Sequence, residues 1–186
     1  MKTRRLISML LSVLMMFMMF PVSTFAEETT EEAVPSLSAS IPAENPSAAE
    51  SDFVFDAETG TITGYRGGGG NVEIPSAING IPVVAIGSGV FYRSDTIANV
   101  TFPESVTLIG DSASYNCSLL TSVTILGCGV SIGITAFSGC VKLNSVQILG
   151  SVTSIGDQAF EKYYNINHLT FPYGLTTIGY GAFFPA

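Results

Sequence analysis

The sequence predicts a repeat solenoid built mostly of β-strand with short helical turns. Two observations lead to this fold class: one segment recurs five times along the chain, and its apolar residues alternate with polar ones. Charged residues make up 12% of the 186 residues and hydrophobic ones 47%, so most of the chain carries enough apolar surface to fold. The length allows one domain together with unfolded appendages.

The segment 1–26 has the pattern of a secretory signal peptide. Three basic residues at the start precede an apolar run over residues 6–20, and the small residues Thr24 and Ala26 fit a cleavage site before Glu27. The apolar run is shorter than the roughly 20 residues that a membrane-spanning helix needs, which disfavours an uncleaved anchor. We therefore expect a secreted or cell-surface protein that is cleaved after Ala26 and has no membrane span thereafter.

Residues 27–52 are expected to form a disordered acidic linker rich in Ser, Pro and Ala. The segment holds six Glu, no basic residue and no aromatic residue, so it cannot bury enough apolar surface to offset the entropy of ordering. After removal of the segment 1–26 the chain keeps four of its seven basic residues and all 15 acidic ones, which gives a net charge of −11. This acidic balance excludes the basic footprint of a nucleic-acid-binding protein.

Five copies of one segment account for most of the chain beyond the linker. They begin at Asn71, Asn99, Ser122, Ser145 and His168, and the later starts are evenly spaced while the first interval is longer by five. We therefore divide the array into repeats 71–98, 99–121, 122–144, 145–167 and an incomplete 168–186. The five extra residues of the first repeat lie around Asn79 and Gly80, which are typical turn residues, so a surface loop is expected there.

Each repeat combines two kinds of periodicity. Residues 122–125 alternate polar and apolar side chains, which predicts a short half-buried strand. The pair Ile132-Gly133 then marks another inward apolar residue and a bend. Over residues 135–143 the apolar spacing changes to one that fits a helical turn or two. Because no repeat can bury its apolar side alone, the copies must stack, with strands expected on one face at 72–74, 100–102, 123–125, 146–148 and 169–171.

The pattern Ile/Phe-Pro-x-x-Val-Thr-x-Ile-Gly-x-x-Ala-Phe-x-x-Cys-x-x-Leu is followed best by residues 102–120 and 145–166. This pattern resembles the BspA-like leucine-rich repeat, and residues 53–65 resemble the hairpin that often opens such arrays. The resemblance covers residues 53–186. It implies a right-handed solenoid with an N-terminal hairpin cap and a glycine loop over 53–70. Proteins of this kind are secreted or lie on the surface of bacteria and some protists, and they are associated with adhesion to host proteins and other cells.

The copies depart from this pattern at a few positions. Ser114 stands where the other repeats have Phe, while Leu126 and Leu149 replace Pro. Ser94 and Tyr163 stand where two other repeats have Cys. These departures leave the spacing intact, so they do not change the expected fold.

The three cysteines are expected to be free thiols. Cys117 and Cys140 occupy the same position in adjacent repeats, which would place them about 4.8 Å apart if the repeats pair as strands do. A disulfide reaches that far, but parallel side chains in register do not favour its torsion, so we expect two buried thiols. Cys128 falls in a turn and is expected to be exposed. None of the three has metal-ligand spacing, and no cofactor is expected.

No catalytic or metal site is predicted. Asp111 and Asp157 both follow an Ile-Gly pair and lie two repeats apart, a separation of roughly 10 Å that is close to the carboxylate pair of an inverting glycosidase. Capping of the helical turn that follows each Asp explains them better. His168, the only histidine, has no partner in register and is expected to lie at the surface.

Outward-facing strand residues supply the candidate binding surface. Stacking places them in two polar ladders, one of Asn71, Asn99, Ser122, Ser145 and His168, the other of Glu73, Thr101, Thr124, Gln147 and Thr170. Such ladders can hydrogen-bond an extended extracellular protein or a glycan. The alternative is that these residues are simply good β-formers on a solvated sheet.

Two functions remain open at this point. The first is a secreted or cell-surface module without catalysis that binds a protein or glycan, as in adhesion. The second is the repeat or targeting part of a larger exported enzyme truncated at its C-terminus. Because the last repeat is incomplete and lacks a polar cap, we also expect self-association through its apolar end.

Overall fold

The computed structural model describes residues 48–162, 171 and 174–185. These residues belong to one unit of the chain, Ser40–Ala186. The expected signal peptide, most of the expected linker, and the ladder residues His168 and Thr170 lie outside the described residues. The fifth expected strand, 169–171, also lies outside them except for Phe171.

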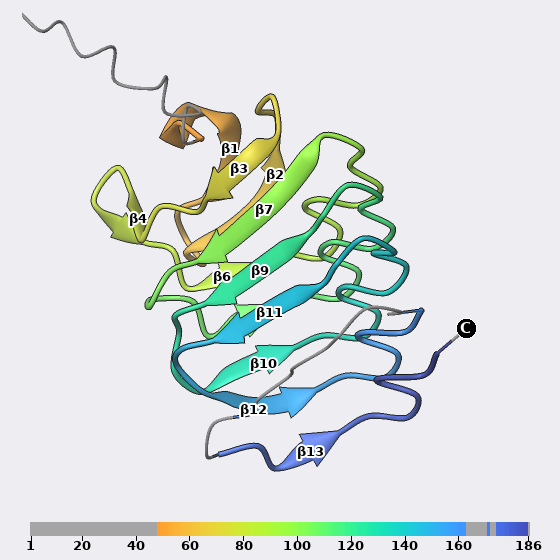
Figure 1. Cartoon of the computed structure of the whole chain (residues 1–186). Coiled ribbons are helices and arrows are strands. Elements are labelled where there is room, and N and C mark those ends of the chain that lie inside the picture. The colour runs from red at the N-terminus through yellow and green to blue at the C-terminus, as the bar shows by residue number, and fades with distance from the viewer. Residues whose placement is uncertain (1–47, 163–170, 172–173, 186) are drawn as a thin grey trace, which may run out of the picture. The chain divides into compact units, whose positions relative to one another are not determined.

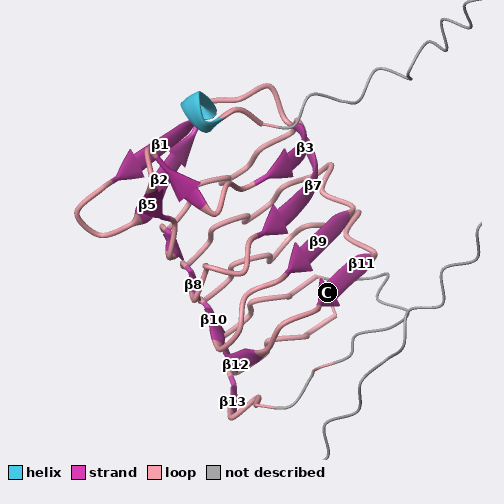
Figure 2. Cartoon of the chain, turned by 90° about the vertical axis from the view of Figure 1, so that its left-hand side faces the viewer, coloured by secondary structure: helices cyan, strands magenta, loops and turns pink. Residues whose placement is uncertain are grey.

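The described repeats stack as turns of a solenoid that carries a β-sheet on each of two sides (Figures 1 and 2). The first sheet is parallel, with the order β11-β9-β7-β3. Its strands are β3 (Gly70–Glu73), β7 (Ile97–Phe102), β9 (Ser122–Ile125) and β11 (Ser145–Ile148). Four of the five expected strands are thereby confirmed as neighbours on one face. The even spacing of the repeats sets their register, since Ser145 pairs with Ser122 and Val146 with Val123.

The second sheet forms where each repeat reaches its Ile-Gly pair, at which the sequence predicted only an inward residue and a bend. Its parallel strands are β6 (Ala85–Ile86), β8 (Leu108–Ile109), β10 (Val130–Ile132), β12 (Val152–Ile155) and β13 (Thr177–Ile178), in that spatial order. Ile109, Ile132 and Ile155 point inward and are at most 1% exposed. These strands are two to four residues long, and their pairing with neighbouring repeats defines them, which the pattern of a single repeat does not reveal.

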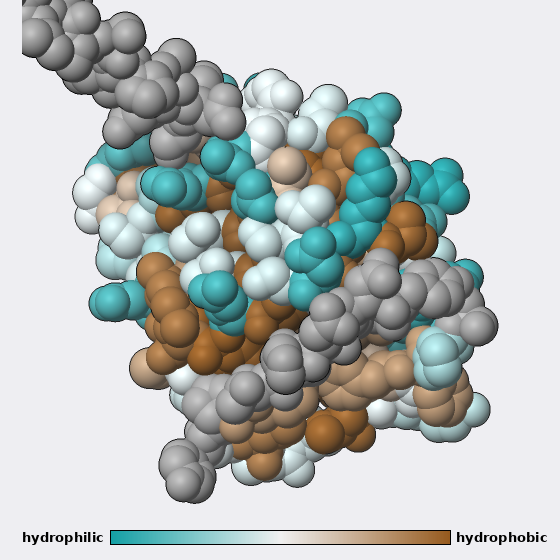
Figure 3. Space-filling model, viewed as in Figure 1, coloured by the Kyte–Doolittle hydropathy of each residue, from teal (hydrophilic) through white to brown (hydrophobic). Residues whose placement is uncertain are grey.

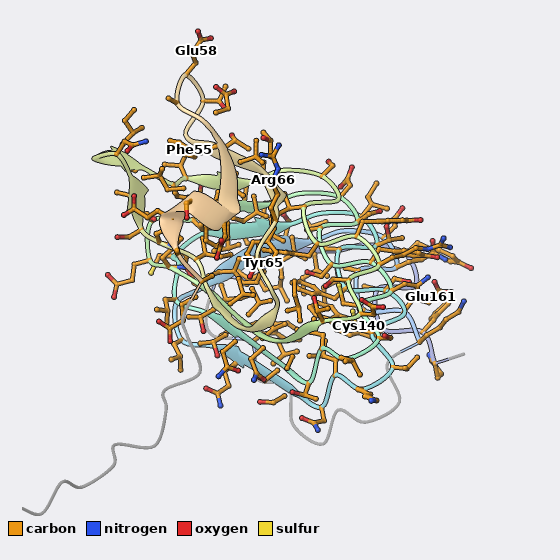
Figure 4. The ribbon with its side chains drawn as sticks, turned by 90° about the horizontal axis from the view of Figure 1, so that it is seen from above. Phe55, Glu58, Tyr65, Arg66, Cys140 and Glu161 are labelled. Atoms are coloured by element: carbon orange, nitrogen blue, oxygen red, sulfur yellow. The ribbon has the colours of Figure 1, made fainter. Side chains whose placement is uncertain are left out.

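A hairpin covers the N-terminal end of the solenoid. A short 3-10 turn, η1 (Glu50–Asp52), leads into β1 (Phe53–Asp56), which pairs antiparallel with β2 (Thr61–Tyr65), and β2 extends the second sheet beside β6. The Tyr65 ring lies 5.2 Å from that of Phe53 and 5.5 Å from that of Phe91, so aromatic contacts join the hairpin to the core. Glu58 marks the hairpin tip, which projects away from the solenoid (Figure 4). The expected hairpin cap is confirmed.

The extra residues of the first repeat fold into a second, smaller hairpin. β4 (Ala77–Ile78) pairs antiparallel with β5 (Ile81–Pro82). The two connecting residues, Asn79 and Gly80, have φ angles of 51° and 76°, as a type I′ turn requires. The expected surface loop is therefore a hairpin whose turn sequence selects its geometry.

The segments expected to be helical are consecutive tight turns. The N–H groups of Ser112 and Ser114 donate to the carbonyl oxygens of Ile134 and Ala136 in the next repeat, at 2.8 and 2.7 Å. A helix would instead direct both N–H groups along its own axis. Ser112 has a φ of 54°, outside the helical region. Apolar spacing could not separate the two structures, because both bring residues three apart to the same side.

The core is a continuous column of apolar side chains. The strand alternation, the Ile-Gly pairs and the Phe of each turn predict eight inward side chains in the third and fourth repeats. Of these, Ile148 is partly buried and the others are buried: Val123, Ile125, Ile132, Phe137, Val146, Ile155 and Phe160. The Phe160 ring stacks on Phe137 at 5.2 Å and on Phe183 at 5.5 Å, with interplanar angles of 13° and 4°. The in-register stack of aromatic rings therefore runs through the last three repeats.

The second repeat interrupts this stack with Ser114. The Ser114 side chain is fully buried, and its Oγ has no hydrogen-bond partner among the described residues. Phe102 of β7 supplies the missing aromatic volume, since it is fully buried and its ring makes an edge contact with Phe137 at 6.2 Å. Phe102 in the strand of the second repeat therefore fills the space that the small Ser114 side chain leaves in the core.

The glycine of each Ile-Gly pair is required by the close approach of successive repeats. A methyl group added at Gly156 would lie 2.6 Å from the carbonyl carbon of Gly133 and 2.6 Å from the backbone nitrogen of Ile134. Gly110 and Gly179 meet the preceding repeat at similar distances. The pair therefore specifies stacking distance, in addition to the bend expected from the sequence.

Candidate functional site

The structure brings the described members of both ladders together on the outer face of the first sheet. In register, Asn99 lies between Asn71 and Ser122, and Ser145 follows beside Ser122. In the other ladder Thr101 lies between Glu73 and Thr124, and Gln147 follows beside Thr124. This face is in front in Figure 1.

The first ladder bonds laterally to itself. Asn99 donates through Nδ2 to Asn71 Oδ1 at 2.6 Å, and Asn99 Oδ1 accepts from Ser122 Oγ at 2.5 Å. Thr121 Oγ1 donates to the same oxygen at 3.0 Å, a contact that sequence reasoning missed because Thr121 precedes the strand. These bonds tie three repeats together and engage Asn71, Asn99 and Ser122 of this ladder, while the Ser145 side chain makes no hydrogen bond to a described residue.

The second ladder is open at three of its described members. The side chains of Thr101, Thr124 and Gln147 make no hydrogen bond to any other described residue. Glu73 and Gln147 are exposed, and Thr101 and Thr124 are partly exposed. Donors and acceptors thus recur at the interstrand spacing of about 4.8 Å.

An apolar margin borders this polar face. Figure 3 shows pale and teal side chains over β7 and β9 and a brown area near the ends of β9 and β11. Leu149, which follows β11 directly, is 69% exposed. The sequence signal for this margin is the replacement of Pro by Leu, which the repeat pattern marks only as a departure.

The cysteines are free thiols, as expected. Cys117 and Cys140 are buried and Cys128 is exposed. The buried sulfurs donate to the carbonyl oxygens of Phe91 at 2.9 Å and Ser114 at 3.0 Å. The hydrogen bond with the neighbouring Cys117 thiol is the larger cause, and burial the second, of a Cys140 pKa well above its ordinary value. Figure 4 shows Cys140 inside the solenoid and Glu161 at its periphery. Cys140 therefore serves as a neutral core residue.

Asp111 and Asp157 have a different role from the one expected. The Oδ1 atom of Asp111 accepts from the backbone N–H of Ile134, and that of Asp157 accepts from Tyr180, both at 2.7 Å. Each partner belongs to the next repeat, so each Asp braces two repeats where a cap of its own turn was predicted. The reason is the one given for the segments expected to be helical: the described residues directly after each Asp form tight turns.

Both aspartates line an open trough of about 310 Å³ on the second sheet. Among the described residues, no group of three or more His, Cys, Asp or Glu side chains lies close enough to hold a metal ion. Within that same part of the chain, no helix has the length and apolar character to cross a bilayer.

Comparisons with known proteins identify the family of this repeat. The family model of the BspA type leucine rich repeat region matches residues 71–185 in six copies, where the spacing of the segments alone gave five. A solved leucine-rich repeat protein of T. pallidum is 30% identical, with a TM-score of 0.68 over 75% of this chain and 67% of that one. No curated protein matches the chain.

Other solved structures are more distant. A leucine rich cell surface protein of Faecalibacterium prausnitzii is 26% identical, with a TM-score of 0.41 over 70% of this chain and 49% of that one. A leucine-rich repeat protein of Bacteroides ovatus is 24% identical, with a TM-score of 0.46 over 69% and 39%. The chain therefore spans half or less of these two proteins. From its repeat motif, its stacked strands and the family match, the chain belongs to the BspA-type leucine-rich repeat family.

Proposed function

We propose that the chain is a non-catalytic binding module that is exported and acts at the cell surface or outside the cell. It binds an extended segment of an extracellular protein or glycan along the ladder of Glu73, Thr101, Thr124 and Gln147. The observation that carries the proposal is the unused hydrogen-bonding capacity of this ladder. The side chains of Thr101, Thr124 and Gln147 lie in register and have no hydrogen-bond partner among the described residues.

Two further features support this function. The parallel sheet holds the ladder residues at fixed spacing, so little entropy is lost when an extended ligand aligns with them. The signal-peptide pattern of the segment 1–26 and the acidic linker fit export of the folded repeats away from the cell body.

We expect that the double substitution Thr101→Arg/Thr124→Arg weakens ligand binding by about tenfold or more, since two long side chains cover the ladder and displace its hydrogen bonds. The measurement is binding of the mature chain to arrays of purified extracellular-matrix proteins and of glycans. Ser118→Arg, at an exposed turn position, is the matched control and should bind as the wild type does. Equal binding by the ladder variant, or no wild-type binding on either array, would contradict the proposal.

We further propose that the chain self-associates through its last described turn. β13 is the edge strand of the second sheet among the described residues. Its Ile178 is 54% exposed, and Tyr180 and Phe184, which follow it, are 74% and 49% exposed. An open strand edge with apolar neighbours favours association.

Light scattering of the mature chain at several concentrations should show a mass that rises with concentration. Addition of a polar capping repeat should restore a monomer, because it pairs the open edge. A concentration-independent monomer without the cap would refute self-association through this turn.

A further inference from the structure

The trough on the second sheet is a second candidate binding site, separate from the ladder of the first sheet. It is lined by residues of β10, β12 and β13 and by Asp111, which lies two residues after β8. Figure 2 shows these strands stacked in one column. The floor of the trough holds the hydroxyl groups of Ser131, Ser154 and Thr177, which follow one another in register. The hydroxyls of Ser131 and Ser154 share a hydrogen bond of 2.7 Å. Gly133 and Gly156 lie beside them and carry no side chain, so the floor stays low over successive repeats.

Two carboxylates give the trough its charge. Asp111 and Asp157 each use Oδ1 for a backbone N–H group, while Oδ2 of each accepts no hydrogen bond from a described residue. None of the described residues that line the trough is basic. The two aspartates lie two repeats apart, roughly 10 Å along the stacking direction, which is too far for one cation to bind both. The site therefore suits two separate positive groups.

The spacing of the carboxylates selects the conformation of a peptide ligand. In an extended strand, residues on one side recur every two positions, at about 7 and 13 Å, and neither distance fits. In a polyproline II helix three residues complete one turn of about 9 Å, so residues i and i+3 lie on the same side at nearly the required distance.

We propose that this trough binds a basic peptide segment in the polyproline II conformation, with Arg or Lys at positions i and i+3. The two basic side chains bind the Oδ2 atoms of Asp111 and Asp157. A polyproline II backbone has no internal hydrogen bonds, so its carbonyl groups can accept hydrogen bonds from the Thr177 hydroxyl. They can also accept from whichever hydroxyl of Ser131 and Ser154 is the acceptor in the hydrogen bond between those two residues. The net charge of −11 on the mature chain attracts such a segment from solution.

The test uses the whole mature chain and a fluorescein-labelled proline-rich peptide with two Arg residues at i and i+3. A second peptide has the same composition with the two Arg at i and i+2. Fluorescence anisotropy should show binding of the first peptide that weakens with added salt, and binding of the second that is at least about fivefold weaker.

Asp111→Asn and Asp157→Asn are the informative variants, because Asn keeps the oxygen that accepts the backbone N–H and loses only the charge. Each should weaken binding of the first peptide by about tenfold or more, since a charge-assisted hydrogen bond is lost. Asp95→Asn removes the same charge at an exposed position outside the trough, and its affinity should stay within about twofold of the wild type. Thermal unfolding of all three variants verifies that the fold is retained.

Three results would overturn the inference. Equal affinity for the two peptides would mean that the spacing of the two Arg residues does not affect binding. An equal loss in the Asp95 variant would mean that overall charge, and not the trough, attracts the peptide. Absence of peptide binding, with binding to an immobilised glycan that Asp111→Asn abolishes, would make the trough a carbohydrate site. These variants leave the ladder of the first sheet intact, so a failure here is distinguishable from a failure of the proposed function.

Discussion

Replacement of Phe160 by Ala is expected to lower the free energy of unfolding by about 3–5 kcal/mol. The side chain is fully buried and its ring stacks between Phe137 and Phe183. Its removal would leave a cavity inside the aromatic stack, and the main chain cannot collapse into it because lateral hydrogen bonds fix the spacing of the repeats. For example, the N–H of Phe160 itself donates to the carbonyl of Ala182 at 2.8 Å.

Urea unfolding followed by circular dichroism measures this loss, with Leu149→Ala as the matched control. Leu149 is 69% exposed, so its truncation should change the free energy of unfolding by less than about 0.5 kcal/mol. A loss below about 1 kcal/mol for Phe160→Ala would mean that Phe160 is not part of the core.

The substitution Gly156→Ala is expected to destabilise the protein by about 3 kcal/mol. At a position where the backbone permits it, Gly→Ala ordinarily stabilises a protein by about 0.4–1 kcal/mol, because it restricts the unfolded chain. Here the added methyl group would lie 2.6 Å from backbone atoms of both Gly133 and Ile134. Backbone atoms of a hydrogen-bonded neighbour cannot move aside as a flexible side chain does, so the repeats must separate locally.

Gly68→Ala in the glycine loop is the control for this second prediction, because a methyl group there would meet nothing within 4 Å. The midpoints of thermal unfolding of the two variants should therefore differ clearly, with the Gly68 variant near the wild type. A Gly156 variant as stable as the wild type would show that the repeats have room for a side chain at this position.

Much of the fold followed from spacing. A constant period with one alternating segment in each copy defines which residues stack, and the register of β7, β9 and β11 follows from it. The second sheet did not follow from spacing, because strands of two to four residues such as β8 and β13 exist only through pairing with a neighbouring repeat. The tight turns were missed for a related reason, since their N–H groups point to the next repeat and a helix has the same apolar spacing.

The candidate sites divide in the same way. Alternation placed Thr101, Thr124 and Gln147 on the outer face of the first sheet. It could not distinguish that ladder from the one containing Asn99, whose amide bonds to Asn71 and Ser122. Hydrogen bonding between side chains depends on atomic positions that the strand pattern leaves open. Asp111 and Asp157 were recognised as a pair, but their partners lie one full repeat further along the chain and not in their own turns.

The sequence alone determined that the repeats stack and which side chains enter the core, because burial follows from the repeated spacing of apolar residues. The burial of Cys117 and Cys140 and the exposure of Cys128 followed from their positions within the repeat. The tertiary structure decided how the repeats satisfy their polar groups. These hydrogen bonds depend on the distance between neighbouring repeats, which Gly156 and the equivalent glycines of the other Ile-Gly pairs set. The open ladder and the trough both depend on that distance, because each holds some groups that lateral hydrogen bonding leaves unused, such as Thr101 and Thr124 in the ladder and Oδ2 of Asp111 and Asp157 in the trough.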